Sequence, residues 1–172
     1  MLGLNKRDVA LRQVRTAIRL FILGEDLVSI HTLAAAAHQV LRDLLKPAGE
    51  GSILKDNDRI RPERRKEFAQ KINEAENFAK HAERDRDAVL DFNPELTHHF
   101  LLDCILMYER LTGRKIKEGI IFAGWYMVRY PETLLDPALK NLAEKVRTQA
   151  GAAVGDPKLL APFLEYDFGD TD

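Results

Sequence analysis

Apolar residues recur along most of this chain at intervals of three and four positions, the spacing that places them on one face of an α-helix. Segments with the alternating pattern of a β-strand are sparse. Glycine, proline and capping residues divide the chain into separate periodic stretches. The pattern therefore predicts an all-α fold. The expected helices span about 7–23, 25–45, 62–84, 93–113 and 115–129, with a sixth opening at 136–137 and a short final one at 156–157.

The ends of several stretches carry helix signals. Gly24 suits the left-handed conformation found just past a helix end, and Pro47 is expected to end the second helix. Asn93 followed by Pro94 is typical of a helix start, because Asn caps well and Pro is tolerated at the first helical position. Two Asp-Pro pairs further along repeat this signature.

Helical spacing also indicates which faces turn inward. In the second predicted helix the small residues of 34–37 would let a neighbouring helix approach closely. The apolar face of that helix is expected to comprise Leu33, Ala37, Val40 and Leu44. The fourth and fifth helices are apolar almost all round, which is typical of helices surrounded by others.

These segments together predict one domain, residues 1–165, built as a single helical bundle of about six main helices with a short C-terminal helix. Residues 46–60 contain Pro, two Gly and clustered charges without a clear period, so we expect the main loop there and the most mobile segment. The acidic tail, 166–172, is expected to fray.

Composition narrows the choice of environment and partner. The 26 Lys and Arg nearly balance the 27 Asp and Glu, so nucleic acid could be contacted only through a local patch. The single cysteine, Cys104, excludes an internal disulfide and fits a reducing cytoplasm. The start of the chain lacks the apolar core of a secretory signal. The apolar stretch 119–128 is about half the roughly 20 residues of a membrane-spanning helix, so no membrane association is expected.

The segment E-N-F-A-K-H, residues 76–81, carries the most specific candidate chemistry. Asn77 and His81 fall on one side of the third helix, away from its apolar stripe of Phe68, Ile72, Ala75, Ala79 and Ala82. A polar side of this kind usually faces solvent. Glu76 and Lys80 would then form an ordinary ion pair one turn apart.

The same segment resembles the R-N-x-x-x-H motif of the HEPN superfamily of helical ribonucleases and nucleotide-binding proteins, with Glu76 at the position where that family commonly has Arg. The resemblance implies that His81 is a catalytic histidine and Asn77 a supporting polar residue, in a cleft between two subunits. Lys80 could supply the positive charge that Glu76 lacks.

A basic segment precedes this motif. R-I-R-P-E-R-R-K, residues 59–66, places cations at a helix start, where they oppose the helix dipole, so helix stability does not explain them. Arg61, Arg64 and Arg65 are therefore candidate contacts for phosphate or RNA. The alternative is a solvated junction balanced by nearby acidic residues: Asp56, Asp58 and Glu63.

Histidines and one interior carboxylate form the remaining candidates. His31 and His38 lie about 10.5 Å apart along one helix, too far to share a metal, and are expected at the edge of the apolar face. There they could bond to a neighbouring helix or line a ligand channel, with Arg15 and Arg19 as anchors for an anion. Asp103 interrupts an apolar run and needs a partner, for which His99, one turn earlier, is the candidate.

Glu95 and His98 give the E-x-x-H spacing of di-iron carboxylate bundles, but no second such motif occurs in the chain, so no metal site and no cofactor is predicted. The sequence also lacks the common nucleotide-binding and hydrolase motifs. The leading interpretation is a non-catalytic cytoplasmic helical protein that forms a homodimer and binds a partner or a small ligand. The alternative is a HEPN-like, metal-independent ribonuclease or RNA-binding protein that uses His81.

Overall fold

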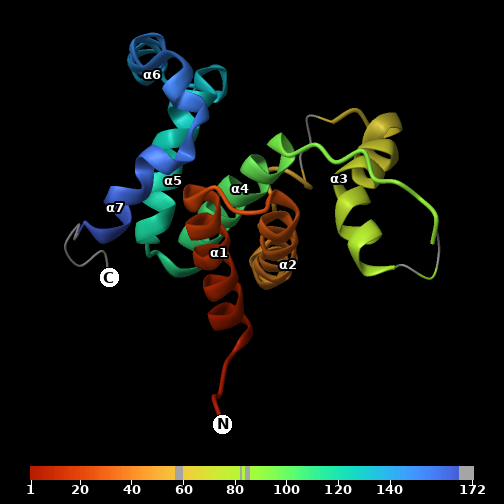
Figure 1. Cartoon of the computed structure of the whole chain (residues 1–172). Helices are drawn as coiled ribbons and strands as arrows, with labels where there is room; N and C mark the ends of the chain where they lie inside the picture. Colours follow the sequence, from red (N-terminus) through yellow and green to blue (C-terminus); the bar gives the residue numbers. More distant parts are fainter. Residues whose placement is uncertain (57–59, 82, 84–85, 167–172) are drawn as a thin grey trace.

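The computed structural model describes residues 1–56, 60–81, 83 and 86–166, and this part of the chain is all-helical (Figure 1). Seven α-helices occur in it: α1 Lys6–Leu23, α2 Leu27–Leu45, α3 Arg65–Lys80, α4 Glu95–Thr112, α5 Lys117–Arg129, α6 Pro137–Ala150 and α7 Ala161–Glu165. Five short 3-10 helices accompany them: η1 Lys46–Ala48, η2 Pro62–Arg64, η3 Pro131–Thr133, η4 Gly151–Gly155 and η5 Pro157–Leu160. Within the described ranges no helix has both the length and the apolar character needed to cross a membrane.

Local signals set most helix ends as predicted. Asn5 and Asp8 form a reciprocal capping box at the start of α1, and Gly24 ends that helix at φ 70°. Gly113 ends α4 in the same way, at φ 71°. The Asp136 side chain accepts hydrogen bonds from two backbone amides at the start of α6. As predicted, α2 ends at Leu45, before Pro47, which lies in the 3-10 helix η1 that follows.

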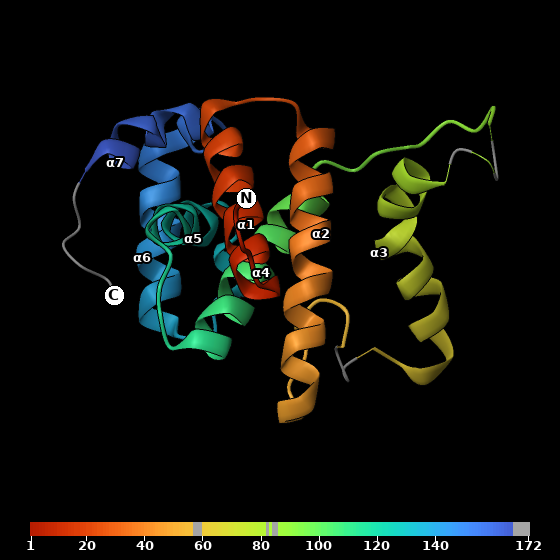
Figure 2. The ribbon, with the colours of Figure 1, turned by 90° about the horizontal axis from the view of Figure 1, so that it is seen from below.

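The centre of the fold is α4, which crosses behind the α1–α2 pair and also contacts α5 (Figure 2). Small side chains allow these approaches. Ala34 of α2 is fully buried, and its carbonyl accepts a hydrogen bond from Cys104 Sγ of α4 at 3.5 Å. Gly119 of α5 packs against Ile105 so closely that an added Cβ would lie 3.1 Å from that side chain. The predicted close helix approach at 34–37 is therefore confirmed.

The inward face of α2 is rotated from the predicted one. The buried apolar positions are Ile30, Ala34, Ala35, Ala37, Leu41 and Leu45, whereas Leu33, Val40 and Leu44 lie at the edge. The rotation follows from α1 and α4 packing on two sides of the alanine-rich surface. As a result His31 and His38 are buried, at 2% and 0% exposure, and the prediction that both lie at the edge is wrong.

Helix α3 stands at the edge of the molecule (Figures 1 and 2). Ile72 is its only buried residue, with Phe68 partly buried against the same core. The predicted helix was longer. The 62–64 part is the 3-10 helix η2, and His81 has left the helical conformation at φ −129°. Ala82 and Arg84, predicted to belong to this helix, lie outside the described residues.

The 46–60 segment, expected to be the most mobile, is attached to the core at its middle. Ser52 is 3% exposed, and the backbone amides of Ile53 and Leu54 both donate to Asp103. Asp56 also binds Arg42 of α2. Residues 57–59 and the tail residues 167–172 lie outside the described part of the chain, so the structure describes neither the junction before α3 nor the predicted fraying.

Candidate functional site

An open groove of about 1240 Å³ runs along α4. Its floor carries Leu102 and Leu106 of α4, and Ala123 and Met127 of α5 form one wall. Thr133, the last residue of η3, and residues 134–135 after it also line the groove, as do residues 46, 49–54 and 56. Eight of the lining side chains are apolar and eight carry a polar or charged group, so the groove offers an occupant an apolar surface with polar groups among it.

A histidine–tyrosine pair lies in the wall of this groove. His99 Nδ1 lies 2.7 Å from the Tyr126 hydroxyl, which joins α4 to α5. Burial lowers the pKa of His99 below its ordinary value, so the ring is neutral at pH 7. Burial, with Tyr130 and Glu132 nearby, raises the pKa of Tyr126 to about 12. The pair therefore offers neutral hydrogen-bonding groups, and neither member carries a charge.

Asp103 lines the groove but is fully engaged by the protein. Its carboxylate accepts from His38 Nε2 at 2.9 Å, from Ser52 Oγ at 2.5 Å, and from the backbone amides of Ile53 and Leu54, each at 3.1 Å. Burial alone would raise the pKa of Asp103, but the hydrogen bonds from His38 and Ser52 outweigh it, and the pKa lies below the ordinary value. Asp103 is thus an ionised anchor for one wall of the groove.

The prediction that Asp103 needs a partner is confirmed, but the predicted partner is wrong. His99 bonds Tyr126 instead, and the histidine at Asp103 comes from α2. The reason is the rotated face of α2, which directs His38 into the core beside α4.

Ser52, His38 and Asp103 do not form a hydrolytic triad. In such a triad the carboxylate and the serine contact different ring nitrogens of the histidine. Here both Asp103 Oδ2 and Ser52 Oγ lie at His38 Nε2, at 2.9 and 3.1 Å. The Ser52 hydroxyl gives its own proton to Asp103. The His38 nitrogen that faces Ser52 is the one that also binds Asp103, so it is not free to take a proton from Ser52. The three residues therefore attach the 46–60 segment to the core and do not activate a nucleophile.

His31 is a core histidine rather than a channel residue. Its Nδ1 lies 3.1 Å from Thr97 Oγ1, and its ring packs edge-on against Phe92 and Phe100. The ring of His38 packs against the same Phe100, with the two ring centroids 4.9 Å apart. The proposed anion anchors are also engaged elsewhere. Arg15 and Arg19 both bind Glu118, at 3.1 and 2.7 Å.

Asn77 and His81 line a second hollow, of about 560 Å³, between α3 and residues 88–90. Glu67, Lys71 and Glu74 line the same hollow, where Lys71 Nζ lies 2.6 Å from Glu74 Oε2, and His81 Nδ1 lies 3.3 Å from Glu83 Oε1. The one lysine of this lining is therefore already paired with a carboxylate. The hollow brings the two motif residues together but offers a phosphate no unpaired lysine among its lining residues.

Glu76 has a structural partner that the sequence pattern does not reveal. It accepts from Lys80 Nζ at 2.6 Å, as predicted for residues one turn apart, and from Lys55 Nζ at 3.4 Å. Lys55 is nearly buried, and its ammonium lies 5.2 Å from the centroid of the Phe100 ring. Lys80 therefore serves an ion pair on the core-facing side of α3 and does not line the hollow with Asn77 and His81.

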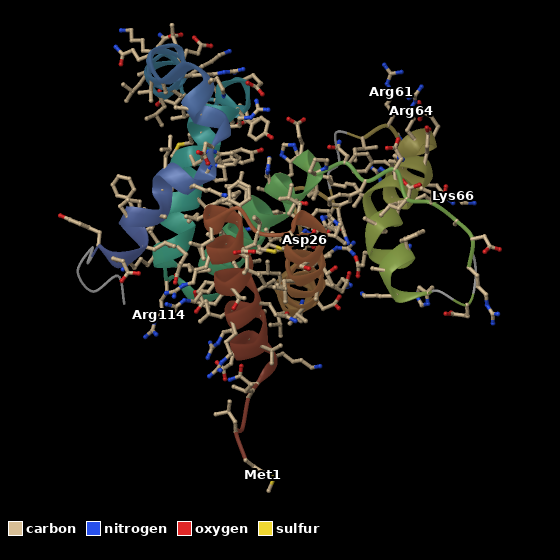
Figure 3. The ribbon with its side chains drawn as sticks, viewed as in Figure 1. Met1, Asp26, Arg61, Arg64, Lys66 and Arg114 are labelled. Atoms are coloured by element: carbon tan, nitrogen blue, oxygen red, sulfur yellow. The ribbon has the colours of Figure 1, made fainter. Side chains whose placement is uncertain are left out.

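The basic residues at the start of α3 lie apart from both hollows. Figure 3 shows Arg61 and Arg64 at the outer end of α3 and Lys66 beside it, with all three side chains exposed. Arg65 Nε donates to the Ile60 carbonyl. Of the acidic residues expected to balance them, Asp56 is bound to Arg42, and Asp58 lies outside the described residues.

No metal centre forms among the residues that the structure describes: no group of three or more His, Cys, Asp or Glu side chains converges. Glu95 pairs with Arg129, and His98 Nδ1 lies 2.8 Å from the Tyr130 hydroxyl. The two residues of the E-x-x-H spacing thus bind protein partners.

Of the predicted site residues, only His99 and Asp103 lie in the larger groove. Sequence reasoning missed its main constituents, the aliphatic residues of α4 and α5, together with Ser52 and Tyr126. Each is an ordinary core-type residue or loop serine, so only the three-dimensional packing identifies them. No protein-family model, no curated protein and no solved structure matches this chain.

Proposed function

We propose that this protein is a non-catalytic cytoplasmic binding protein whose α4–α5 groove takes an apolar helical segment. The observation that carries the proposal is the groove itself, about 1240 Å³ in volume, with eight apolar side chains from α4, α5 and the flanking loops in its lining. Pockets for small molecules usually measure about 300–1,000 Å³ and enclose their ligand. A larger trough open to solvent suits the ridge of a helix.

The chemistry of the lining supports binding rather than catalysis. Asp103 is occupied by four donors, and His99 is paired with Tyr126. Among the described lining residues no histidine, cysteine or serine is placed to act as a nucleophile with a free base beside it. Cys104 is buried, and burial raises the pKa of its thiol. An unpaired cysteine of this kind fits a reducing compartment.

The ribonuclease alternative remains a prediction, and no observation in the structure favours it. Asn77 and His81 share a hollow, but Glu67 and Glu74 line it too, and its one lysine, Lys71, is paired with Glu74. Glu76 is held between two lysines and is not directed to that hollow. For this reason the groove, and not the motif, is the basis of the proposed function.

The proposal is tested by the binding of 8-anilinonaphthalene-1-sulfonate, a dye that fluoresces on apolar surfaces, at low micromolar protein. We expect Met127→Glu to reduce dye binding at least tenfold, because it places a charge in the groove wall. Val28→Glu is the matched control, since Val28 is an exposed apolar residue on α2, 48% accessible and outside the groove. Circular dichroism of each variant verifies the fold. Equal dye binding by the two variants would overturn the proposal.

A further inference from the structure

A basic face lies where α1 packs against the start of α5, and it is formed by four arginines: Arg12, Arg15, Arg19 and Arg114. Residues 6–19 and 109–118 together hold nine Lys or Arg and three Asp or Glu, whereas the rest of the chain holds 17 and 24. The nearly balanced total therefore includes one strongly positive region. A local patch of this kind is what an anionic partner requires of a protein whose net charge is −1.

Two arginines of the basic face are held in place by a buried carboxylate. Glu118, in the first turn of α5, is 1% exposed, and Arg15 and Arg19 contact it at 3.1 and 2.7 Å. Burial alone would raise the pKa of Glu118, but hydrogen bonds from the backbone and from the two arginines outweigh it, so the carboxylate is ionised. Glu118 thus neutralises one of the two positive charges and leaves the other.

The guanidinium groups of Arg15 and Arg19 are also accessible to a ligand. Their side chains are 47% and 51% exposed, and the Nη1 group of each takes part in neither contact with Glu118. Because the Nε side of each group is fixed by the carboxylate, little side-chain freedom is lost when a second anion binds. Planar N–H groups fixed in this way suit the oxygens of a phosphate.

The other two arginines extend the basic face on both sides of this pair. Arg12, Arg15 and Arg19 recur at intervals of three and four residues, so they share one side of α1 and are spaced by about 4.5 and 6 Å along its axis. Figure 3 shows Arg114 on the side of α1 away from α3, and its side chain is exposed. Among the described residues, neither Arg12 nor Arg114 has an ion-pair partner for its side chain.

The acidic residues in these two stretches do not neutralise the basic face. Asp8 belongs to the capping box of α1, and Glu109 Oε1 lies 4.0 Å from Lys115 Nζ. Arg110 is not part of the face, because it lies 3.7 Å from Glu50 Oε2. The excess positive charge is therefore carried by the four arginines.

The shape of the basic face indicates an extended anion. None of its four arginines lines either the α4–α5 groove or the hollow beside α3, so the face does not enclose a small molecule. Cations repeated along a helix suit an anion whose charges repeat too, as phosphates do along a nucleic-acid strand. The apolar side of α1 is buried in the core, so this helix has no apolar face to insert into a lipid bilayer.

The composition of the region favours a duplex over a single strand. Proteins that bind single strands add aromatic side chains on which the bases stack. Residues 6–19 and 109–118 contain no Phe, Trp or Tyr. A duplex needs no such platform, because its phosphates are displayed on the outside.

We propose that the basic face binds the phosphate backbone of a double-stranded nucleic acid without reading its sequence. Binding of this kind weakens steeply with salt, because each phosphate that an arginine neutralises releases counterions. The inference goes beyond the proposed function. The basic face and the α4–α5 groove share no residue, so each can be tested without the other.

The first test is the fluorescence anisotropy of a labelled duplex of about 20 base pairs, prepared once as DNA and once as RNA. We expect micromolar binding of at least one duplex at about 50 mM salt, weakened roughly a hundredfold at about 200 mM, as four phosphate contacts imply. Arg12→Glu combined with Arg114→Glu should weaken binding at least tenfold at the lower salt. No binding by the wild type at micromolar protein, or binding that salt does not weaken, would overturn the inference.

The matched control reverses two charges elsewhere. Arg61→Glu combined with Arg64→Glu acts at the outer end of α3, which Figure 3 shows on the opposite side of the α1–α2 pair from Arg114. This variant should keep its duplex affinity within twofold. Equal weakening by the two double variants would overturn the inference, because net charge alone would then set the affinity. Changing Arg12 and Arg114 leaves both arginines on Glu118, and circular dichroism verifies the fold.

A competition arm separates a nucleic acid from a lipid surface, which also presents phosphates. Vesicles of phosphatidylserine and phosphatidylcholine are added to the protein with its labelled duplex, at the phosphate concentration at which unlabelled duplex displaces half of the label. We expect the vesicles to displace less than a tenth of it. Displacement by vesicles equal to that by unlabelled duplex would assign the basic face to a membrane surface and overturn the inference.

Discussion

Lys55 Nζ lies 3.4 Å from Glu76 Oε2, and this contact joins the 46–56 segment to α3. Lys55 and Glu76 are 7% and 12% exposed at their side chains, so the pair lies largely out of water. Burial lowers the pKa of Lys55, with the Glu76 carboxylate opposing that shift. The residue that departs from the R-N-x-x-x-H pattern is thus the one that attaches α3 to the body of the protein.

Removing Glu76 should destabilise the protein more than removing its partner. Glu76→Ala leaves the Lys55 ammonium nearly buried without a counter-charge, at a cost of about 3 kcal/mol. Lys55→Met keeps the aliphatic stem over Phe100 and removes the charge, so we expect a loss of about 1 kcal/mol or less. Urea unfolding of both variants and of the double variant measures the coupling. Equal losses of unfolding free energy in the two single variants would show that leaving the Lys55 ammonium without Glu76 carries no extra cost.

Asp103 should be the most sensitive polar position in the protein. Asp103→Asn keeps the shape but removes the charge and places an amide donor among four donors, so we expect a loss of about 3 kcal/mol in unfolding free energy. Ser52→Ala removes only one of these bonds and should cost about 1–2 kcal/mol. Thermal unfolding compares the two variants. A milder effect for Asp103→Asn than for Ser52→Ala would contradict the proposed anchoring role.

The stability of the protein should fall in mild acid, and His98 should account for part of the fall. Burial, with His99 and Arg129 nearby, lowers the pKa of His98 from 6.5 to about 4. Between these values the unfolded chain binds a proton that the folded chain does not, so the stabilisation is complete above pH 6.5 and is lost as the pH falls toward 4.

The pH effect is checked by urea unfolding at several pH values between 7.5 and 4. His98→Phe keeps the aromatic contacts with Phe21 and Trp125 but cannot titrate, so its unfolding free energy should depend less steeply on pH. His31 and His99, whose pKa values are also lowered by burial, continue to contribute in that variant. An unchanged dependence of the unfolding free energy on pH would mean that His98 takes up its proton at the same pH in the folded and the unfolded chain.

Ribonuclease activity dependent on His81 is not expected. The test incubates the purified protein, with and without EDTA, with a mixed pool of structured and single-stranded RNA, beside His81→Ala. We expect no cleavage by either protein, because the one lysine lining the hollow that Asn77 and His81 share, Lys71, is paired with Glu74. Chelator-resistant cleavage by the wild type that His81→Ala abolishes would restore the alternative suggested by the HEPN resemblance.

The helical architecture was predictable because its signals are local. Gly24, Gly113 and Asp136 each act within one turn of the helix that they end or begin, so neighbouring residues in the sequence are enough to predict these helix ends. The burial of Asp103 was predictable for a related reason, since a single carboxylate in an apolar run has few other places to lie.

The groove and the partner of Asp103 were not predictable in the same way. Sequence spacing identifies neighbours on one helix and therefore suggested His99, whereas His38 lies 65 residues away and is brought in by the packing of α2 on α4. The groove draws aliphatic residues from α4, α5 and two loops, none of which is unusual alone.

The attachment of α3 has a consequence for how the protein opens. Ile72 is the only buried residue of α3, and the Lys55–Glu76 ion pair joins it to the body, so we expect α3 to open as a separate unit of low local stability. Its amide hydrogens should exchange with solvent through partial opening, while those of α1, α2 and α4 exchange only when the whole domain unfolds. We therefore expect proteases to cleave the chain first at α3, because opening α3 requires less free energy than unfolding the whole domain.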